Sequence, residues 1–190
     1  MTVKKSLGKN ASVFPMPVLM IATYDENGKV NVMNAAWGMN CEMDQLILCL
    51  TGTHKTSKNL RLNKACTVAL ADQAHLKEAD YFGMASGNKT EDKFERTGLH
   101  AVRSEKVNAP IIEEFPIVME CELLEEVETE NLHCFVVKVL DTLAEESVLK
   151  EDGKPCMHKA GAVLFNQFRA SYMGIGEKVG QAWDEGKAFL

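Results

Sequence analysis

Apolar residues along this chain recur mainly in short runs with the two-residue period of β-strands. The run Pro17 to Tyr24 is followed by a turn containing Asn27-Gly28, a strong hairpin signal because both residues tolerate positive φ. In the return run, Lys29 to Ala36, polar and apolar residues alternate, which places Val32 and Asn34 on one face. The pattern near the start of the chain therefore predicts an antiparallel hairpin.

Further apolar runs predict more strands and few helices. The additional strands are expected at Leu46 to Leu50, Cys66 to Ala71, Ile117 to Val127 and His133 to Leu143, with a last strand or loop at Met157 to Phe165. The expected helices are one that begins at an N-cap at Thr56 or Ser57, then Leu76 to Phe82, Glu91 to Arg96, and a C-terminal helix over about 175–189. This balance favours a mainly β protein, a barrel with a few helices, rather than a doubly wound sheet. No repeat or linker divides the chain, so we expect residues 1–190 to form a single domain.

Composition narrows the function classes. The chain has 190 residues, 46% hydrophobic and 25% charged, with a net charge of −6, which argues against general affinity for nucleic acid or anionic membranes. No apolar stretch approaches the roughly 18 to 20 residues that span a bilayer. Pro15 and Pro17 interrupt the apolar run near the N-terminus, so it does not match a signal peptide. The six cysteines include no CxxC pair. Cys156 and His158 could form half of a metal site, but no second pair of ligands stands at the required spacing. We therefore expect reduced thiols, no metal site and a cytoplasmic protein.

The segment Thr51 to Asn59 is the strongest local candidate for a binding site. It follows an apolar strand, opens a helix, and carries hydroxyl, imidazole, amide and lysine side chains within nine residues. The start of a helix offers unpaired backbone N–H groups and the positive end of its dipole, which suit a phosphate group. The alternative interpretation is a well-capped surface helix with solvated lysines.

The segment Asn34 to Gly38 is a second candidate. Its small residues, Ala35 and Ala36, would let a flat ring approach the backbone, and Trp37 could stack on that ring. The alternative is a core tryptophan beside small packing residues. Because no serine-hydrolase or metal-hydrolase signature occurs in the chain, any reactivity is expected to come from a bound cofactor.

Taken together, these segments resemble the flavin-reductase-like FMN-binding family, and especially its flavoredoxin branch. The resemblance covers roughly Val13 to Gly186. It rests on the order and spacing of PVLMIATYDENGKVNVMNAAWG, LTGTHKTSKNL, GMASGNKTEDKF and YMGIGEKVGQAW in one chain of this size.

The resemblance implies a split β-barrel of Greek-key type whose homodimer interface helps to hold FMN. It implies three groups of cofactor-binding residues: Asn34, Ala35, Ala36 and Trp37 along the isoalloxazine ring; Thr51, Lys55, Thr56 and Asn59 at the phosphate and ribityl chain; and Ser86, Gly87 and Lys93, from the same or the other subunit, to complete the site.

The resemblance also implies a first-choice activity, NAD(P)H-dependent flavin reduction, with NADH or NADPH as co-substrate. In related reductases a Gly-Asp-His motif lies near the nicotinamide. Here the corresponding stretch is Asn131-Leu132-His133, so His133 is the candidate for nicotinamide contact. The alternatives are an electron-transfer protein that receives electrons from a redox partner without oxidising nicotinamide, and a protein that only stores FMN.

Overall fold

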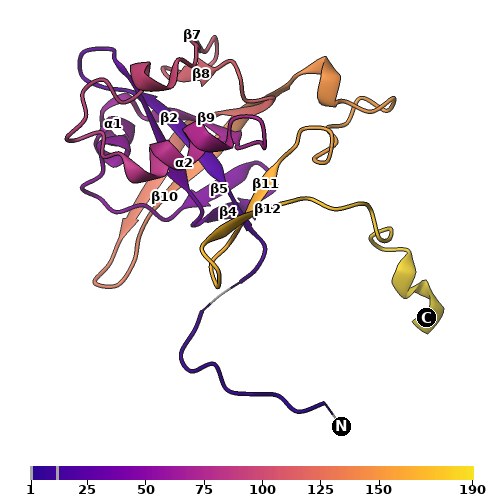
Figure 1. Cartoon of the computed structure of the whole chain (residues 1–190). Helices are drawn as coiled ribbons and strands as arrows, with labels where there is room; N and C mark the ends of the chain where they lie inside the picture. Colours follow the sequence, from indigo (N-terminus) through magenta and orange to yellow (C-terminus); the bar gives the residue numbers. More distant parts are fainter. Residues whose placement is uncertain (1, 12) are drawn as a thin grey trace.

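Strands dominate the structure, a computed structural model that describes residues 2–11 and 13–190 (Figure 1). The strands are β1 Met16–Pro17, β2 Leu19–Tyr24, β3 Val30–Ala35, β4 Gly38–Glu42, β5 Gln45–Leu48, β6 Ala65–Leu70, β7 Ala101–Arg103, β8 Pro110–Ile112, β9 Ile117–Glu128, β10 His133–Ala144, β11 Val163–Asn166 and β12 Ser171–Gly174. The helices are α1 Lys55–Asn63 and α2 Leu76–Met84, with short 3-10 helices at Glu95–Thr97, Glu146–Val148 and Glu185–Phe189. The prediction of a mainly β protein with a few helices is confirmed.

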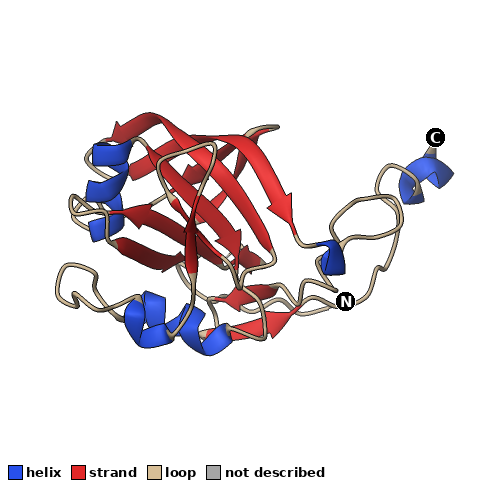
Figure 2. Ribbon diagram, turned by 90° about the horizontal axis from the view of Figure 1, so that it is seen from above, coloured by secondary structure: helices blue, strands red, loops and turns tan. Residues whose placement is uncertain are grey.

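Seven strands form one antiparallel sheet in the order β3-β2-β6-β9-β10-β5-β4. β3 and β4 are consecutive in the chain yet lie at opposite edges of this sheet. Only Ala36 and Trp37 connect them, and the chain from Ala35 to Gly38 spans roughly 11 Å at most. The two edges must therefore approach each other, which curls the sheet into a barrel that stays open between β3 and β4. Figure 2 shows the strands curving around the core, with both α-helices on the outside.

Two hydrophobic clusters lie on the two faces of β2. Leu19 and Ile21 point into the barrel, where Leu60 of α1 and Phe135 of β10 join them. Met20 points to the other face and packs with the cluster beneath α2. Full burial of side chains of this size contributes about 1.5–3 kcal/mol each. Both faces of β2 are thus covered, which explains why its sequence is almost continuously apolar.

The start of α1 differs from the prediction by two or three residues. The helix begins at Lys55, and the N-cap is His54 rather than Thr56 or Ser57. The two hydroxyls are engaged elsewhere: Thr56 accepts a hydrogen bond from Asn31, and Ser57 donates one to the carbonyl of Thr51.

The predicted C-terminal helix over about 175–189 is wrong. Only the 3-10 helix Glu185–Phe189 forms there, and the tail leads away from the barrel (Figure 1). Val179 and Trp183 are almost fully exposed. An amphipathic segment without a surface to cover lacks the packing that stabilises a short helix. Among the described residues no helix is long and apolar enough to cross a membrane.

Candidate functional site

The turn at Thr51–His54 places the first residues of α1. His54 donates from its backbone to the Thr51 carbonyl at 3.0 Å, and the Ser57 hydroxyl donates to the same oxygen at 2.8 Å. The His54 side chain makes no capping hydrogen bond to the helix. The first N–H groups of α1 therefore remain available, at the positive end of the helix dipole, as the sequence predicted.

A cavity of about 150 Å³ lies beside this helix start and is called the phosphate cavity below. Its walls are Asn31, Met33, Asn34, His54, Lys55, Thr56, Phe82, Gly83, Met84, Ala85, Ser86, Gly87, Asn88 and Lys93. Asn88 links the loop after α2 to the turn before α1, because its side-chain amide donates to the Thr53 carbonyl at 3.0 Å. A Cβ on Gly87 would lie 2.2 Å from the Asn31 side-chain oxygen. Glycine at position 87 therefore allows the loop to close against the helix start.

Two nitrogen groups in the phosphate cavity have no anionic partner among the described residues. Lys93 is only 5% exposed, and its ammonium donates to the Phe82 carbonyl at 2.9 Å. Burial lowers the pKa of Lys93 to about 8. The His54 Nδ1 atom is buried without a hydrogen-bond partner in the described part of the chain. Burial, and then the Lys93 charge, lower the pKa of His54. An unpaired buried cation beside an unsatisfied nitrogen fits an anionic, hydrogen-bonding ligand.

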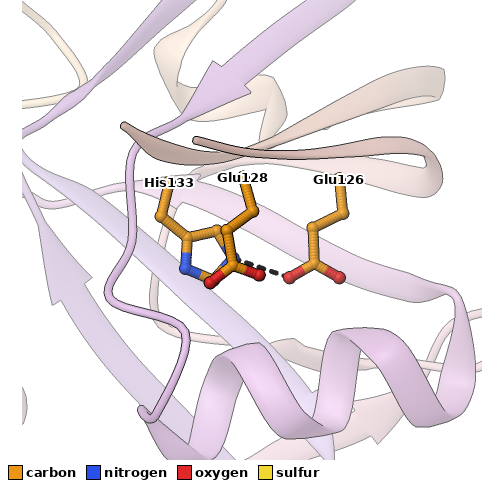
Figure 3. Close-up of side chains that lie close together, drawn as sticks. All are labelled: Glu126, Glu128 and His133. Atoms are coloured by element: carbon orange, nitrogen blue, oxygen red, sulfur yellow. Dashed lines mark hydrogen bonds and ion pairs between the residues drawn. The ribbon is translucent and has the colours of Figure 1, made fainter. Parts of the chain in front are cut away.

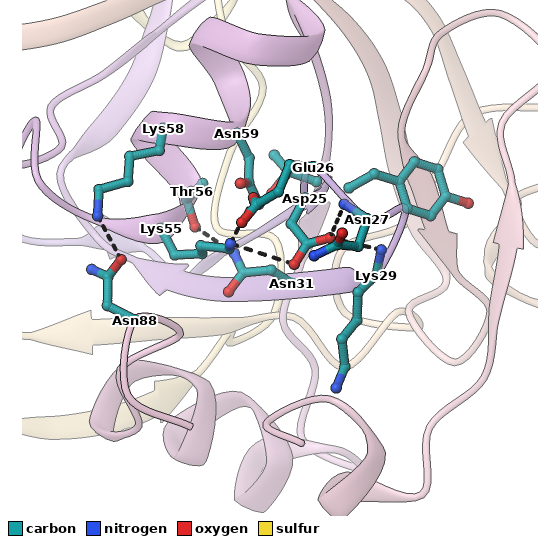
Figure 4. Close-up of polar contacts among 12 residues, drawn as sticks. Asp25, Glu26, Asn27, Lys29, Asn31, Lys55, Thr56, Lys58, Asn59 and Asn88 are labelled. Carbon is teal, nitrogen blue, oxygen red and sulfur yellow. Dashed lines mark hydrogen bonds and ion pairs between the residues drawn. The ribbon is translucent and has the colours of Figure 1, made fainter. Parts of the chain in front are cut away.

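Lys55 lines the phosphate cavity, and Figure 4 shows its side chain next to Asp25 and Glu26. Its ammonium lies 2.9 Å from Glu26 Oε2 and 3.4 Å from Asp25 Oδ2, both on the turn between β2 and β3. Beyond it opens a more polar cavity of about 540 Å³. Lys55 thus stands between the phosphate cavity and solvent, with carboxylates as its present partners.

A third cavity, of about 550 Å³, adjoins the phosphate cavity and is called the ring cavity. Met33, Asn34, His54, Gly83 and Met84 line both. The other walls of the ring cavity are Ala35, Ala36, Trp37, Cys49, Leu50, Thr51, Asp80, Phe165 and Tyr172. The shared residues make the two cavities one continuous site.

Aromatic side chains form one wall of the ring cavity. The ring centroids of Trp37 and Phe165 are 6.5 Å apart, and those of Phe165 and Tyr172 are 6.0 Å apart. The Tyr172 hydroxyl donates to Asp80 at 2.8 Å. Burial and the neighbouring Asp80 charge raise the pKa of Tyr172 to about 12, so the phenol stays protonated. Ala35 and Ala36, which precede Trp37 in the chain, add no bulky side chain to the lining, and the cavity therefore suits a planar ring.

Ten of the eleven cofactor-binding residues expected from the resemblance line these two cavities. They are Asn34, Ala35, Ala36, Trp37, Thr51, Lys55, Thr56, Ser86, Gly87 and Lys93. Asn59 does not. It is 1% exposed, and its amide donates to the Thr23 hydroxyl at 3.0 Å, on the side of α1 that faces β2. Its amide thus satisfies a buried hydroxyl rather than facing a ligand.

Several cavity residues were not among those expected. His54 stands inside the segment that the sequence singled out, so its imidazole could have been included. Asn31, Gly83 and Tyr172 come from three other elements, and no local pattern links them to the helix start. Only the closure of the fold brings them together.

His133 lies outside the lining of both cavities. It is paired with Glu128 across β9 and β10, and Glu126 lies two residues from Glu128 along β9, so the three side chains share one face (Figure 3). The His133 Nε2 atom lies 2.6 Å from Glu126 Oε1. The imidazole is thus engaged within the protein, which gives no support to the expected nicotinamide contact.

Ligand atoms of Glu126, Glu128 and His133 lie within 4.8 Å of one another, a spacing that could hold a metal ion. The Arg61 guanidinium already occupies the Glu126 carboxylate, through Nε at 3.0 Å to each oxygen and through a second, shorter contact. This contact, with His133, lowers the pKa of Glu126 to about 2. A fixed cation at this point repels a metal ion, so we interpret the cluster as an ion-pair network.

The family model described as "Flavin reductase like domain" matches residues 11–167. The chain belongs to the flavin reductase-like family. A flavoredoxin of Desulfovibrio vulgaris (Miyazaki F) is 32% identical, with 97% of this chain and 100% of that chain covered and a TM-score of 0.92. A flavoredoxin from Methanosarcina acetivorans is 26% identical, with 100% of each chain covered and a TM-score of 0.88.

A third solved structure is similar to this chain in fold. It is a putative flavin reductase with a split barrel domain from Shewanella frigidimarina, 18% identical, with 87% of this chain and 84% of that chain covered and a TM-score of 0.78. The expected split barrel and the resemblance to flavoredoxins are therefore both confirmed.

Proposed function

We propose that this protein binds FMN across the phosphate cavity and the ring cavity. The observation that carries the proposal is a pair of nitrogen groups in the phosphate cavity: the buried Lys93 ammonium, which has no anionic partner among the described residues, and the unsatisfied Nδ1 of His54, which also lines the ring cavity. A phosphate at the start of α1 would receive hydrogen bonds from the first backbone N–H groups of the helix and from the Thr56 hydroxyl. Lys55 and Lys93, which line the same cavity, would add positive charge. The membership of the flavin reductase-like family supports the same cofactor.

The ring cavity has the shape and chemistry for the isoalloxazine. Ala35 and Ala36 would leave room at the ring edge, and the Trp37 side of the aromatic wall would cover a face. The flavin, when bound, supplies reversible acceptance of a hydride or of electrons. The residues of the chain bind and orient it, and the neighbouring positive charges favour an anionic reduced ring. No side chain is required as a nucleophile.

The activity that we propose first is NAD(P)H-dependent reduction of the flavin. The second candidate is electron transfer from a protein donor without nicotinamide oxidation. One observation favours this second candidate: His133, the residue expected to contact nicotinamide, is held by Glu126.

A homodimer is the assembly that we propose. A cavity of about 280 Å³ lies between the edge strand β4 and the N-terminal residues Ala11, Val13, Pro15, Met16 and Pro17, and Trp37 and Met39 contribute exposed apolar side chains to it. An exposed apolar patch at the edge of a sheet is typical of an interface. Trp37 lines this cavity and the ring cavity alike, so a second copy seated here would reach the flavin site. We also propose a cytoplasmic location, in keeping with six unpaired cysteines.

The test is an absorption spectrum of the purified protein after addition of FMN and removal of the excess, repeated after anaerobic addition of NADH or NADPH. Retained flavin bands that bleach would support the reductase. Bands that persist with both nucleotides, but bleach with a chemical reductant, would support the electron carrier. Failure to retain FMN would overturn the proposed function.

A further inference from the structure

Arg61, in the last turn of α1, connects three parts of the molecule. Its Nη1 donates to the Gly52 carbonyl at 2.8 Å, in the turn that precedes the same helix. Its Nε and Nη2 hold the Glu126 carboxylate of β9, and the guanidinium lies 5.6 Å from the centre of the Phe135 ring. Through Arg61 the turn before α1 is tied to the β9–β10 hairpin.

His133 lies beside Arg61 Nη2, at 3.4 Å from its Nε2 atom, and also packs against this turn. A Cβ on Gly52 would lie 2.1 Å from His133 Cε1 and 2.5 Å from its Nδ1. Contacts shorter than 3.0 Å are essentially never made by real Cβ atoms, and these involve a ring that Glu126 holds in place. Position 52 is thus closed to any residue but glycine unless the His133 ring moves.

The peptide that Arg61 and His133 contact, at Gly52, belongs to the turn that leads into the lining of the phosphate cavity. Thr51 lines the ring cavity, His54 lines both cavities, and Gly52 lies between them in the chain. The His54 carbonyl in turn accepts from the backbone of Lys58 at 3.1 Å, in the first turn of α1. A shift at Gly52 would move the His54 nitrogen and the first helix amides together.

We propose that Arg61, Glu126 and His133 are positioning residues that hold the Thr51–His54 turn in the geometry needed to bind the flavin phosphate. This inference rests on the proposed function and extends it to residues that do not touch the cofactor. It also gives His133 a role other than nicotinamide contact.

The test compares FMN with riboflavin, which has the same ring but no phosphate. Dissociation constants for both are measured by quenching of flavin fluorescence for the wild type, Gly52→Ala, Arg61→Gln and Glu126→Gln. A displaced phosphate contact should weaken FMN binding by about tenfold or more in each variant, the scale of one charge-assisted hydrogen bond. Riboflavin affinity should change less than about threefold, because riboflavin has no phosphate for the first helix amides to hold and most of the ring cavity is lined by residues outside the turn.

The double variant Gly52→Ala/His133→Ala is the sharpest arm of the experiment. Removing the imidazole removes the two atoms that the new Cβ would meet below 3.0 Å and leaves Arg61 Nη2 at 3.0 Å, so FMN affinity should recover in part relative to Gly52→Ala alone. Two matched controls lie away from the site. Gly176→Ala adds a Cβ with nothing within 4 Å, and Arg96→Gln breaks an exposed ion pair with Asp92. Both should keep the wild-type ratio of the two affinities.

Equal losses for FMN and riboflavin would show a general structural role and overturn the inference, as would an unchanged ratio in all three single variants. If one variant fails to fold, Arg61→Lys keeps the charge without the planar fork and should give an intermediate ratio. A wild-type protein that binds neither flavin would overturn the proposed function itself, which is a different result from an unchanged ratio.

Discussion

Two basic residues of α1, six positions apart, are held in opposite ways. Lys55, at the first position, meets Asp25 and Glu26 through a single ammonium, and the Glu26 side chain is 63% exposed. Arg61, in the last turn, grips Glu126 through two nitrogens and uses a third on the Gly52 carbonyl. The Lys55 ammonium is therefore suited to exchanging its partners, whereas the Arg61 guanidinium is fixed by its several hydrogen bonds.

The difference follows from side-chain chemistry. An ammonium is a point charge on a flexible stem, whereas a guanidinium is a planar fork whose hydrogen bonds fix its direction. Burial disfavours the Lys55 charge, but Glu26 and Asp25 outweigh that effect and raise the pKa of Lys55. A phosphate could take the place of these carboxylates. Arg61 is suited to holding the backbone, and the binding site divides the two tasks between the two ends of a nine-residue helix.

The largest expected effect is on FMN binding by Lys55→Gln. Loss of one charge-assisted hydrogen bond to the phosphate should weaken FMN about 10- to 100-fold. The free energy of unfolding should change by less than about 1 kcal/mol, because the closer ion pair of Lys55, at 2.9 Å, is with the exposed Glu26 and the pair with Asp25 is longer, at 3.4 Å. Isothermal titration and chemical denaturation measure the two quantities. Lys77→Gln, an exposed lysine on α2, is the control, and equal FMN affinity in both variants would contradict the assignment.

Arg61→Gln, unlike Lys55→Gln, should clearly lower the free energy of unfolding of the protein without flavin. Its hydrogen bonds to a carboxylate and to a backbone carbonyl are worth about 1.5–3 kcal/mol, and urea denaturation should show a loss on that scale. If Lys55→Gln destabilised the protein as much as Arg61→Gln, the contrast between the two ends of α1 would disappear.

Acid should leave the Arg61 contact in place until low pH. Arg61, and then His133, hold the pKa of Glu126 at about 2, below its ordinary 4.5. A lowered carboxyl pKa stabilises the fold fully above about pH 4.5, and that contribution is lost as the pH falls toward 2. Glu128 faces the same cluster and also acts on Arg61. The stability difference between wild type and Glu126→Gln should therefore be constant near neutrality and close in that acid range. A difference that closed already above pH 5 would refute the assignment.

The smallest expected effect is a gain. Glu26→Gln removes a carboxylate that competes with phosphate for Lys55, so FMN affinity should rise about two- to fivefold at low salt. The gain should shrink as ionic strength increases, because Glu26 is exposed to solvent. A titration series in sodium chloride measures it, and a loss of affinity would mean that Glu26 orients Lys55 rather than competing for it.

Much of the fold was within reach of the sequence because its signals are local. The Asn27-Gly28 turn, with Gly28 at φ +75°, joins β2 and β3 as predicted. The long apolar runs of β9 and β10 form the strands that the pattern indicated. The tail around Val179 shows the limit, since its amphipathic pattern had no surface to pack on and only one short 3-10 helix formed.

The residues of the candidate site also differ in whether a local sequence signal points to them. Lys55 and Thr56 lie in the segment that the sequence singled out, because a helix start leaves marks in adjacent residues, whereas Gly87 was expected only from the family resemblance; all three line the phosphate cavity. Asn59, expected in the same group, lies on the side of α1 that faces β2, and the composition of a segment does not tell which side of its helix faces the barrel. The contact between Arg61 and Glu126 spans 65 residues, and only the register of β9 against β10 brings the carboxylate over the helix.

The position of Trp37 gives the protein an optical reporter of its own. The chain has two tryptophans, and the other, Trp183, is 95% exposed in the tail. A flavin in the ring cavity would lie against Trp37 and absorb the light that an excited indole emits. Emission from Trp37 should therefore dim as the cofactor enters, while Trp183 contributes a steady background that Trp183→Phe would remove. Occupancy of the site could then be followed in real time, without a label.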